Sequence, residues 1–342
     1  MDVTNQNSAF DQTPFLARAR GTALLTTAGI TVLLFTVPTL GLTLLWNVLI
    51  PLVPALLVLA PGLWRNVCPL AVAAHFPVGK GRYAAKRCTP ERTALLNLAA
   101  VAVLLLIVPL RHAFFDTHPV GTTLLLAALV LSALAVGTLL GGRNGWCAGL
   151  CPLYPVEKLY GSGNVFTFRN GRCARCSRCT APCPDTVRAA RPFTLRNRWH
   201  TLAGTLMIGG FPGFIWGWFQ VPDDMAISGV SDLSVLYAAP FTGLAVTAFL
   251  YEALRHRLEE TTRVQLFAAA AVASYYAFRI PNLLGFGRFH GDGMLIDLSQ
   301  TLPVWTVVAA VAAETLFFFW WFLRRGSGAT RPWLNRPENG IV

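Results

Sequence analysis

The chain has 342 residues, of which 54% are apolar and only 13% are charged. This composition excludes an ordinary soluble globular domain, in which about a quarter of the residues are charged. The net charge of +12 would suit a nucleic-acid-binding protein, but the cations stand in blocks between long apolar runs. We therefore exclude nucleic acid as a partner and expect membrane lipid to be one.

Apolar segments long enough to cross a bilayer recur along the chain. The first apolar run extends from Thr22 to Trp64, which at about 1.5 Å per residue is twice a hydrocarbon core of ~30 Å. It must therefore turn back, and Pro38 and Gly41 mark the turn. We expect eight transmembrane helices, near residues 21–37, 42–62, 93–110, 120–140, 201–220, 234–254, 264–280 and 302–323.

Lysine and arginine distinguish the two sides of this predicted membrane protein. The basic connections hold Arg18, Arg20, Arg65, Lys80, Arg82, Lys86, Arg87, the arginine-rich segment 143–198, Arg255, Arg257, Arg263, Arg324, Arg325, Arg331 and Arg336. The alternate connections hold Asp116, Asp223, Asp224, Asp232, Asp292 and Asp297, with only Arg111 and Arg288. The positive-inside rule predicts a multi-pass protein of the bacterial inner membrane with both termini in the cytoplasm.

The connection between the fourth and fifth predicted spans carries the most informative motif, Cys173-Ala-Arg-Cys176-Ser-Arg-Cys179-Thr-Ala-Pro-Cys183-Pro184. It matches the C-x2-C-x2-C-x3-C-P run with which bacterial ferredoxins hold [4Fe–4S] clusters. Zinc sites usually pair two C-x2-C knuckles across a longer gap. The spacing therefore predicts an iron–sulfur site.

Eight cysteines are present in all, and every one lies on the predicted cytoplasmic side, where a reducing environment disfavours disulfides. Cys147-Ala-Gly-Leu-Cys151-Pro152 repeats the second half of the ferredoxin motif. In two-cluster ferredoxins each motif lends its last cysteine to the other cluster. This rule predicts one cluster on Cys173, Cys176, Cys179 and Cys151, and a second on Cys147, Cys183, Cys68 and Cys88. Two alternatives stay open: Cys183 stays with its own run, or Cys68 and Cys88 are inert buried thiols.

The predicted fold class is an all-α polytopic membrane protein with a small cytoplasmic ferredoxin-like insert. Its parts are a cytoplasmic tail (1–20), a four-helix membrane part (21–140) with a cysteine-bearing loop (63–92), the iron–sulfur segment (141–199), a second four-helix membrane part (200–323) and a cytoplasmic tail (324–342).

At these residues the sequence resembles the membrane-bound ferredoxin family that includes NapH, the NosR iron–sulfur region and CcoG. The resemblance rests on the element from Gly142 to Pro152, on Cys68-Pro69 and on the downstream ferredoxin run, and it covers about residues 40–190. It implies electron transfer between quinol, cytoplasmic donors and periplasmic or metal acceptors. The last four predicted spans lie outside it.

Other polar residues suggest further roles. Histidine pairs such as His200 with His256, or His112 with His290, could ligate haem, a less favoured interpretation because most histidines lie at span ends. His112, Asp116 and His118 could bind a metal or exchange protons with a quinone, although a solvated loop is the simpler interpretation.

Glu314 falls within the eighth predicted span and is a speculative proton-carrying group, with Arg279 as a suggested companion. A structural polar contact between helices is an equal alternative. Arginines interleaved with the cysteines either dock an acidic partner and tune the clusters or simply follow the positive-inside rule. These arginines are Arg172, Arg175, Arg178, Arg188 and Arg191.

The leading hypothesis is a membrane-bound electron-transfer protein with two [4Fe–4S] clusters, acting as a subunit of a quinol-linked oxidoreductase or a similar relay. Its partners would be a ferredoxin, a flavodoxin or a membrane reductase subunit, together with a quinone. One alternative is a CcoG-like factor that reduces copper for oxidase assembly. The other is a redox sensor. No G-x-G-x-x-G, P-loop or nucleophile elbow indicates a soluble enzyme.

Overall fold

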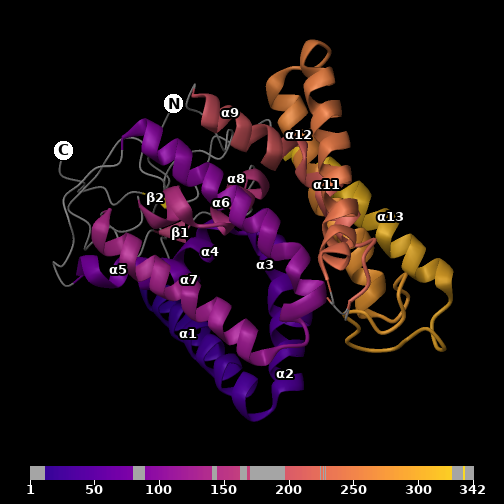
Figure 1. Ribbon diagram of the computed structural model, residues 1–342, viewed down its shortest axis with the longest axis horizontal. Coiled ribbons are helices and arrows are strands. Elements are labelled where there is room, and N and C mark those ends of the chain that lie inside the picture. The colour runs from indigo at the N-terminus through magenta and orange to yellow at the C-terminus, as the bar shows by residue number, and fades with distance from the viewer. Residues whose placement is uncertain are drawn as a thin grey trace.

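The computed structural model describes residues 12–79, 89–140, 145–161, 168–169, 197–223, 225, 227, 229–325 and 334–335. Their regular elements are helices apart from two short strands (Figure 1). The first half contains α1 (Gln12–Thr36), α2 (Pro38–Thr43), η1 (Leu44–Leu49), α3 (Ile50–Leu59), α4 (Pro61–Val67), α5 (Pro69–Gly79), α6 (Pro90–Leu110), η2 (Arg111–Phe115), α7 (Pro119–Leu139), η4 (Trp146–Leu150) and α8 (Leu153–Tyr160). The second half contains α9 (Arg198–Gly204), η6 (Thr205–Gly209), α10 (Phe211–Trp218), α11 (Val230–Ala253), η7 (Leu254–His256), α12 (Glu260–Leu283), α13 (Val304–Trp320) and η8 (Trp321–Arg325).

Within the part of the chain that the structure describes, six helical segments are long and apolar enough to cross a membrane. They are 14–36, 38–59, 91–115, 119–139, 230–256 and 304–324. Large apolar side chains on them are exposed, such as Leu25 at 74% and Phe249 at 77%, as expected of surfaces that face lipid. The chain is therefore a polytopic membrane protein, and the predicted turn near Pro38 is confirmed, because α1 ends at Thr36 and α2 begins at Pro38.

The other two predicted spans coincide with helices that are not among these six. Residues 198–218 form α9 and α10, which are separated by the π-helical turn η6 and a bend at Gly210. Helix α12 is 24 residues long but carries Gln265, Tyr275 and Arg279, which lower its hydropathy.

Small residues allow the helices to approach closely within each half. A Cβ on Gly137 of α7 would collide with the backbone of Ala74 in α5, and a Cβ on Gly213 of α10 would collide with the backbone of Gly243 in α11. Such close contacts are typical of helix packing in membranes. They fix α5 against α7 and α10 against α11.

Helix α12 fastens the second half to the first. The Tyr276 hydroxyl donates to the carbonyl oxygen of Pro51 (2.7 Å) and accepts from the amide of Ala55 (2.8 Å), so it is inserted into one turn of α3. Arg279 donates from Nη2 to the carbonyl oxygen of Trp46 (2.9 Å) and to Asn47 Oδ1 (2.7 Å). Both side chains therefore bind backbone groups of the second membrane segment (38–59), and Arg279 also binds the Asn47 side chain.

Two predicted boundaries differ from the structure. The N-terminal tail was predicted over 1–20, but α1 already begins at Gln12. The predicted loop 63–92 contains the end of α4 and all of α5, because the apolar run that follows Pro69 continues as a helix. Strand β1 (Phe168–Arg169) pairs in parallel with β2 (Leu334–Asn335).

Candidate metal centre

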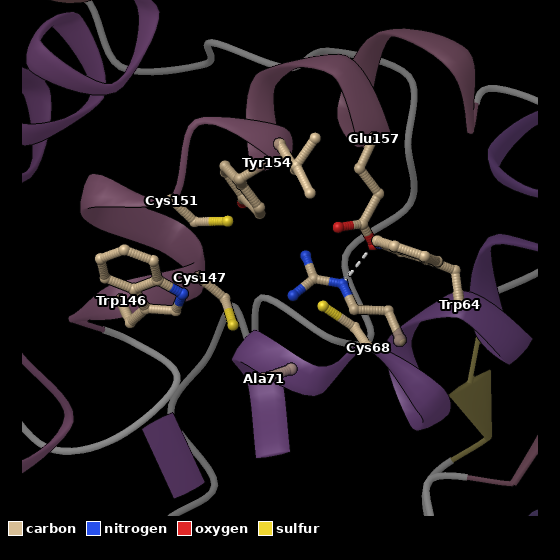
Figure 2. A pocket seen from close by; sticks show the side chains of 10 residues that line it. Trp64, Cys68, Ala71, Trp146, Cys147, Cys151, Tyr154 and Glu157 are labelled. Carbon is tan, nitrogen blue, oxygen red and sulfur yellow. Dashed lines mark ion pairs between the residues drawn. The ribbon is translucent and has the colours of Figure 1, made fainter. Parts of the chain in front are cut away.

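Three cysteines from two distant segments line one buried pocket (Figure 2). Cys68 lies between α4 and α5, Cys147 lies in η4, and Cys151 follows η4 directly. Each is at most 6% exposed, and no disulfide joins them. The pocket is also lined by Trp64, Arg65, Ala71, Trp146, Leu153, Tyr154 and Glu157. We call it the cysteine pocket.

A following proline gives two of these cysteines similar backbone dihedral angles. Cys68 (φ −52°, ψ 120°) precedes Pro69, and Cys151 (φ −66°, ψ 118°) precedes Pro152. A residue before proline avoids the helical region because of the clash with the proline ring. Each Cys-Pro pair therefore ends one helix and begins another, which sets its thiol at a helix junction.

A π-helical turn shapes the segment that carries the other thiol. The amide of Cys151 donates to the carbonyl oxygen of Trp146 (2.9 Å), five residues earlier. Such turns are rare and are frequent at functional sites. The wider turn brings Trp146, Cys147 and Cys151 to the pocket together.

A buried ion pair closes one side of the cysteine pocket. Arg65 of α4 pairs through Nε with Glu157 of α8, and these side chains are only 2% and 5% exposed. The Arg65 guanidinium also lies 5.2 Å from the centre of the Tyr154 ring. A buried charge is costly unless it is paired, so this contact ties α4 to α8 across the cysteines.

Burial also affects the thiols. It raises the pKa of Cys68, and it raises the pKa of Cys151 well above its ordinary value, with the neighbouring Cys147 and Cys68 adding to the effect. Thiolates gathered in this apolar setting require a compensating positive charge. Binding of a metal removes thiol protons and supplies that charge, so three buried cysteines in one pocket fit a metal or an iron–sulfur group.

The structure therefore brings together three of the predicted site residues, Cys68, Cys147 and Cys151. The other five cysteines, which are Cys88, Cys173, Cys176, Cys179 and Cys183, lie outside the described residues. The five arginines near the ferredoxin run also lie outside them. The ligand sets of the two clusters stay predictions.

At the far end of α6, a second group of polar residues is buried. His112 is 4% exposed, with Nδ1 against Asp223 and Nε2 3.0 Å from the carbonyl oxygen of Trp218. Arg111 Nε pairs with Asp116 Oδ1 (2.9 Å), and its Nη2 lies 3.7 Å from Asp223 Oδ2. We call Arg111, His112, Asp116 and Asp223 the His112 cluster. The interpretation of His112 and Asp116 as a solvated loop is wrong, although His118 is exposed.

The His112 cluster is a poor cation site. Candidate ligand atoms of His112, Asp116 and Asp223 lie within 4.8 Å of one another. Arg111 already pairs with both carboxylates, so a metal ion would meet its charge. Burial disfavours the Asp223 carboxylate, but the hydrogen bond with His112 and the charge of Arg111 outweigh it and lower the pKa of Asp223 to about 2.

The histidines suggested for haem are engaged or exposed. Both ring nitrogens of His112 have partners, and His290 is exposed. His200 Nε2 lies 3.3 Å from Asn97 Nδ2, whereas His256 is exposed and accepts from Arg255. These contacts give no support to either haem pair.

Glu314 lies half-buried on α13 and accepts from Thr315 through Oε2. Arg279, its suggested companion, instead binds Trp46 and Asn47. The role of Glu314 as a proton group stays a prediction.

Sequence reasoning missed the partners around both sites. Arg65 was assigned to the membrane surface by the positive-inside rule, yet it is 2% exposed and paired with Glu157. Asp223 was assigned to an acidic loop. Nothing in the local sequence marks these pairs, because their members are 92 and 111 residues apart. Trp146, in contrast, stands inside the motif, directly before Cys147.

Comparison with known proteins gives one partial similarity. A stretch of 61 residues is 39% identical to the methylamine utilization ferredoxin-type protein MauN of Methylobacillus flagellatus. It covers 17% of this chain and 22% of that protein, so the chain spans about a fifth of the relative it matches. No family model matches the chain, and no solved structure does. The similarity supports a ferredoxin-type relationship for part of the chain. It does not show that the chain belongs to the family of NapH, NosR and CcoG.

Proposed function

We propose that this protein is a membrane-bound electron-transfer protein that carries two [4Fe–4S] clusters on one membrane face. One observation carries the proposal: three buried cysteines from separate segments line one pocket, in a chain that also holds a complete ferredoxin run. The partial similarity to a ferredoxin-type protein supports it. When bound, such clusters accept and donate single electrons.

The cysteine pocket supports a ligand role for Cys68. Cys68 shares a pocket with Cys147, which is 79 residues away in the sequence and belongs to a ferredoxin-like motif. This position supports a ligand role and is not expected of an inert thiol. The predicted cluster set and its alternative both put Cys68, Cys88 and Cys147 on one cluster. They differ in the fourth ligand, Cys183 or Cys151. Because Cys151 lines the same pocket, the geometry favours the alternative, in which Cys183 stays with its own run.

An eight-span topology belongs to the same proposal. Near its start α6 contacts His200 through Asn97, and η2 at its end contacts Trp218 through His112. Because α6 is one of the six candidate spans, residues 198–218 traverse the same depth. Helix α12 has 24 residues, about 36 Å, which is enough to cross a hydrocarbon core of ~30 Å.

Orientation and partners follow from charge. The positive-inside rule places the cysteine pocket on the cytoplasmic face of a bacterial inner membrane. The arginines around the ferredoxin run would dock an acidic donor such as a ferredoxin or flavodoxin. Electrons would pass between that donor, or a quinol, and a membrane or periplasmic partner.

Metal analysis of anaerobically purified protein tests the proposal. We expect about eight iron and eight sulfide per chain, no haem, and an EPR signal of interacting clusters after reduction with dithionite. About four iron would contradict the two-cluster assignment. Zinc in place of iron, or no metal in protein reconstituted anaerobically with iron and sulfide, would overturn the electron-transfer function.

A further inference from the structure

The indole of Trp146 holds a buried hydrogen-bond donor beside the cysteines. Trp146 is the first residue of η4 and is 1% exposed. Its Nε1 is buried and has no hydrogen-bond partner among the residues that the structure describes. Figure 2 shows the nitrogen edge of the indole turned toward Cys147 and the pocket. The donor therefore faces the site where a metal group is proposed.

A donor in this position calls for an acceptor. Buried indole N–H groups usually find a partner, and a buried donor left without one costs roughly 1–3 kcal/mol. Two side chains of the pocket carry oxygen acceptors: the Glu157 carboxylate is already engaged by Arg65, and the Tyr154 ring lies against the Arg65 and Lys158 cations. The indole nitrogen is instead turned toward the Cys147 side chain (Figure 2). A neutral thiol is a weak acceptor, whereas a sulfur that carries negative charge is a strong one.

We propose that the Trp146 indole donates a hydrogen bond to a sulfur of the iron–sulfur group held at Cys68 and Cys147, and so sets its reduction potential. This inference rests on the proposed function. Reduction adds negative charge to the group, and an N–H aimed at sulfur stabilises that added charge. Trp146 is thus a positioning and tuning residue rather than a ligand. It raises the potential of one cluster relative to the other.

The replacement Trp146→Phe keeps an aromatic ring and removes the donor. We expect full iron and sulfide content and a reduction equilibrium shifted about tenfold toward the oxidised form, which corresponds to 59 mV for a one-electron couple. Only one of the two clusters should shift in an EPR-monitored redox titration. Unchanged potentials in a protein with full iron content would overturn the inference.

Trp218→Phe provides the matched control. Trp218 is also buried, at 5% exposed, and its Nε1 also has no partner among the described residues. It lies beside the His112 cluster, at the other end of α6. Trp218→Phe should leave both potentials unchanged, and an equal shift in the two variants would show that the effect is not local to the cysteine pocket and would overturn the inference.

A second measurement covers the case in which Trp146→Phe fails to assemble. In wild-type protein with 15N-labelled indole, pulsed EPR of the reduced state should detect coupling of the cluster spin to an indole nitrogen and to an exchangeable proton. Trp218→Phe should keep this coupling. Its absence in wild-type protein that contains iron would refute the role of Trp146 and leave the proposed function intact, whereas wild-type protein without iron would refute the proposed function itself.

Discussion

The cysteine pocket and the His112 cluster lie at opposite ends of α6, and both are buried. They differ in how their buried polar groups are compensated. In the His112 cluster every charged group has an opposite charge beside it, supplied by the protein itself. The cysteine pocket instead brings together three buried thiols from two distant segments of the chain. A site that is complete in itself indicates structure. A site that gathers several buried thiols instead fits a bound metal group.

Removal of a ligand from the cysteine pocket should have the largest effect. We expect Cys68→Ser to lose one whole cluster, so that iron falls from about eight to about four per chain, because a cubane requires four protein ligands. Ala71→Ser is the matched control, since it adds the same hydroxyl to the wall of the same pocket and keeps every thiol. Equal iron in wild-type protein and Cys68→Ser would mean that Cys68 is an inert thiol.

The next largest effect concerns the ion pair that closes the pocket. Arg65→Met leaves Glu157 buried without its partner, and such a change costs about 3–5 kcal/mol. The double replacement Arg65→Met with Glu157→Leu should recover most of that loss. Unfolding in denaturant, followed by circular dichroism, measures both.

Arg255→Met serves as the control for that experiment. Arg255 lies 3.8 Å from Glu252, but the two side chains are 59% and 43% exposed, so its loss should cost about 1 kcal/mol or less. A similar loss in Arg65→Met and Arg255→Met would contradict the importance of the buried pair.

In the His112 cluster, Asp223→Asn should lower stability by about 1–3 kcal/mol, since it weakens the contacts with His112 and Arg111. The iron content should not change. The pKa of Asp223 in the folded protein, about 2, lies below its ordinary 3.8. Its stabilisation is therefore complete above pH 3.8 and is lost as the pH falls toward 2.

The stability difference between wild-type protein and Asp223→Asn should shrink over that pH range. A difference that grows as the pH falls would have the wrong sign for a carboxylate stabilised in its charged form. Loss of iron in Asp223→Asn would contradict the distinction between a structural His112 cluster and a metal-binding cysteine pocket.

The smallest effect is expected for Tyr276→Phe. It removes the hydroxyl that bridges Pro51 and Ala55, but these two backbone groups stand four residues apart and can then bond to each other as in a regular helix. We expect a loss of about 1 kcal/mol or less in the same unfolding assay. A larger loss would show that the bridge fixes α12 against α3.

The sequence predicted what depends on local pattern. Apolar runs gave six segments now seen as candidate spans, and Pro38 marked the first turn. The Cys-Pro motifs predicted that Cys68 and Cys147 would meet, and they line one pocket. The contacts of Arg65 with Glu157, and of His112 with Asp223, depend on tertiary packing. The positive-inside rule counts an arginine without distinguishing one that faces headgroups from one that is buried.

A cryo-EM map of the anaerobically purified protein, combined with X-ray fluorescence to identify the metal, tests the central claim most directly. We predict iron and density for a cluster in contact with the sulfur atoms of Cys68 and Cys147, with the Trp146 indole facing it. Three thiols that bind zinc, that form a disulfide, or that surround only water in iron-replete protein would contradict the account.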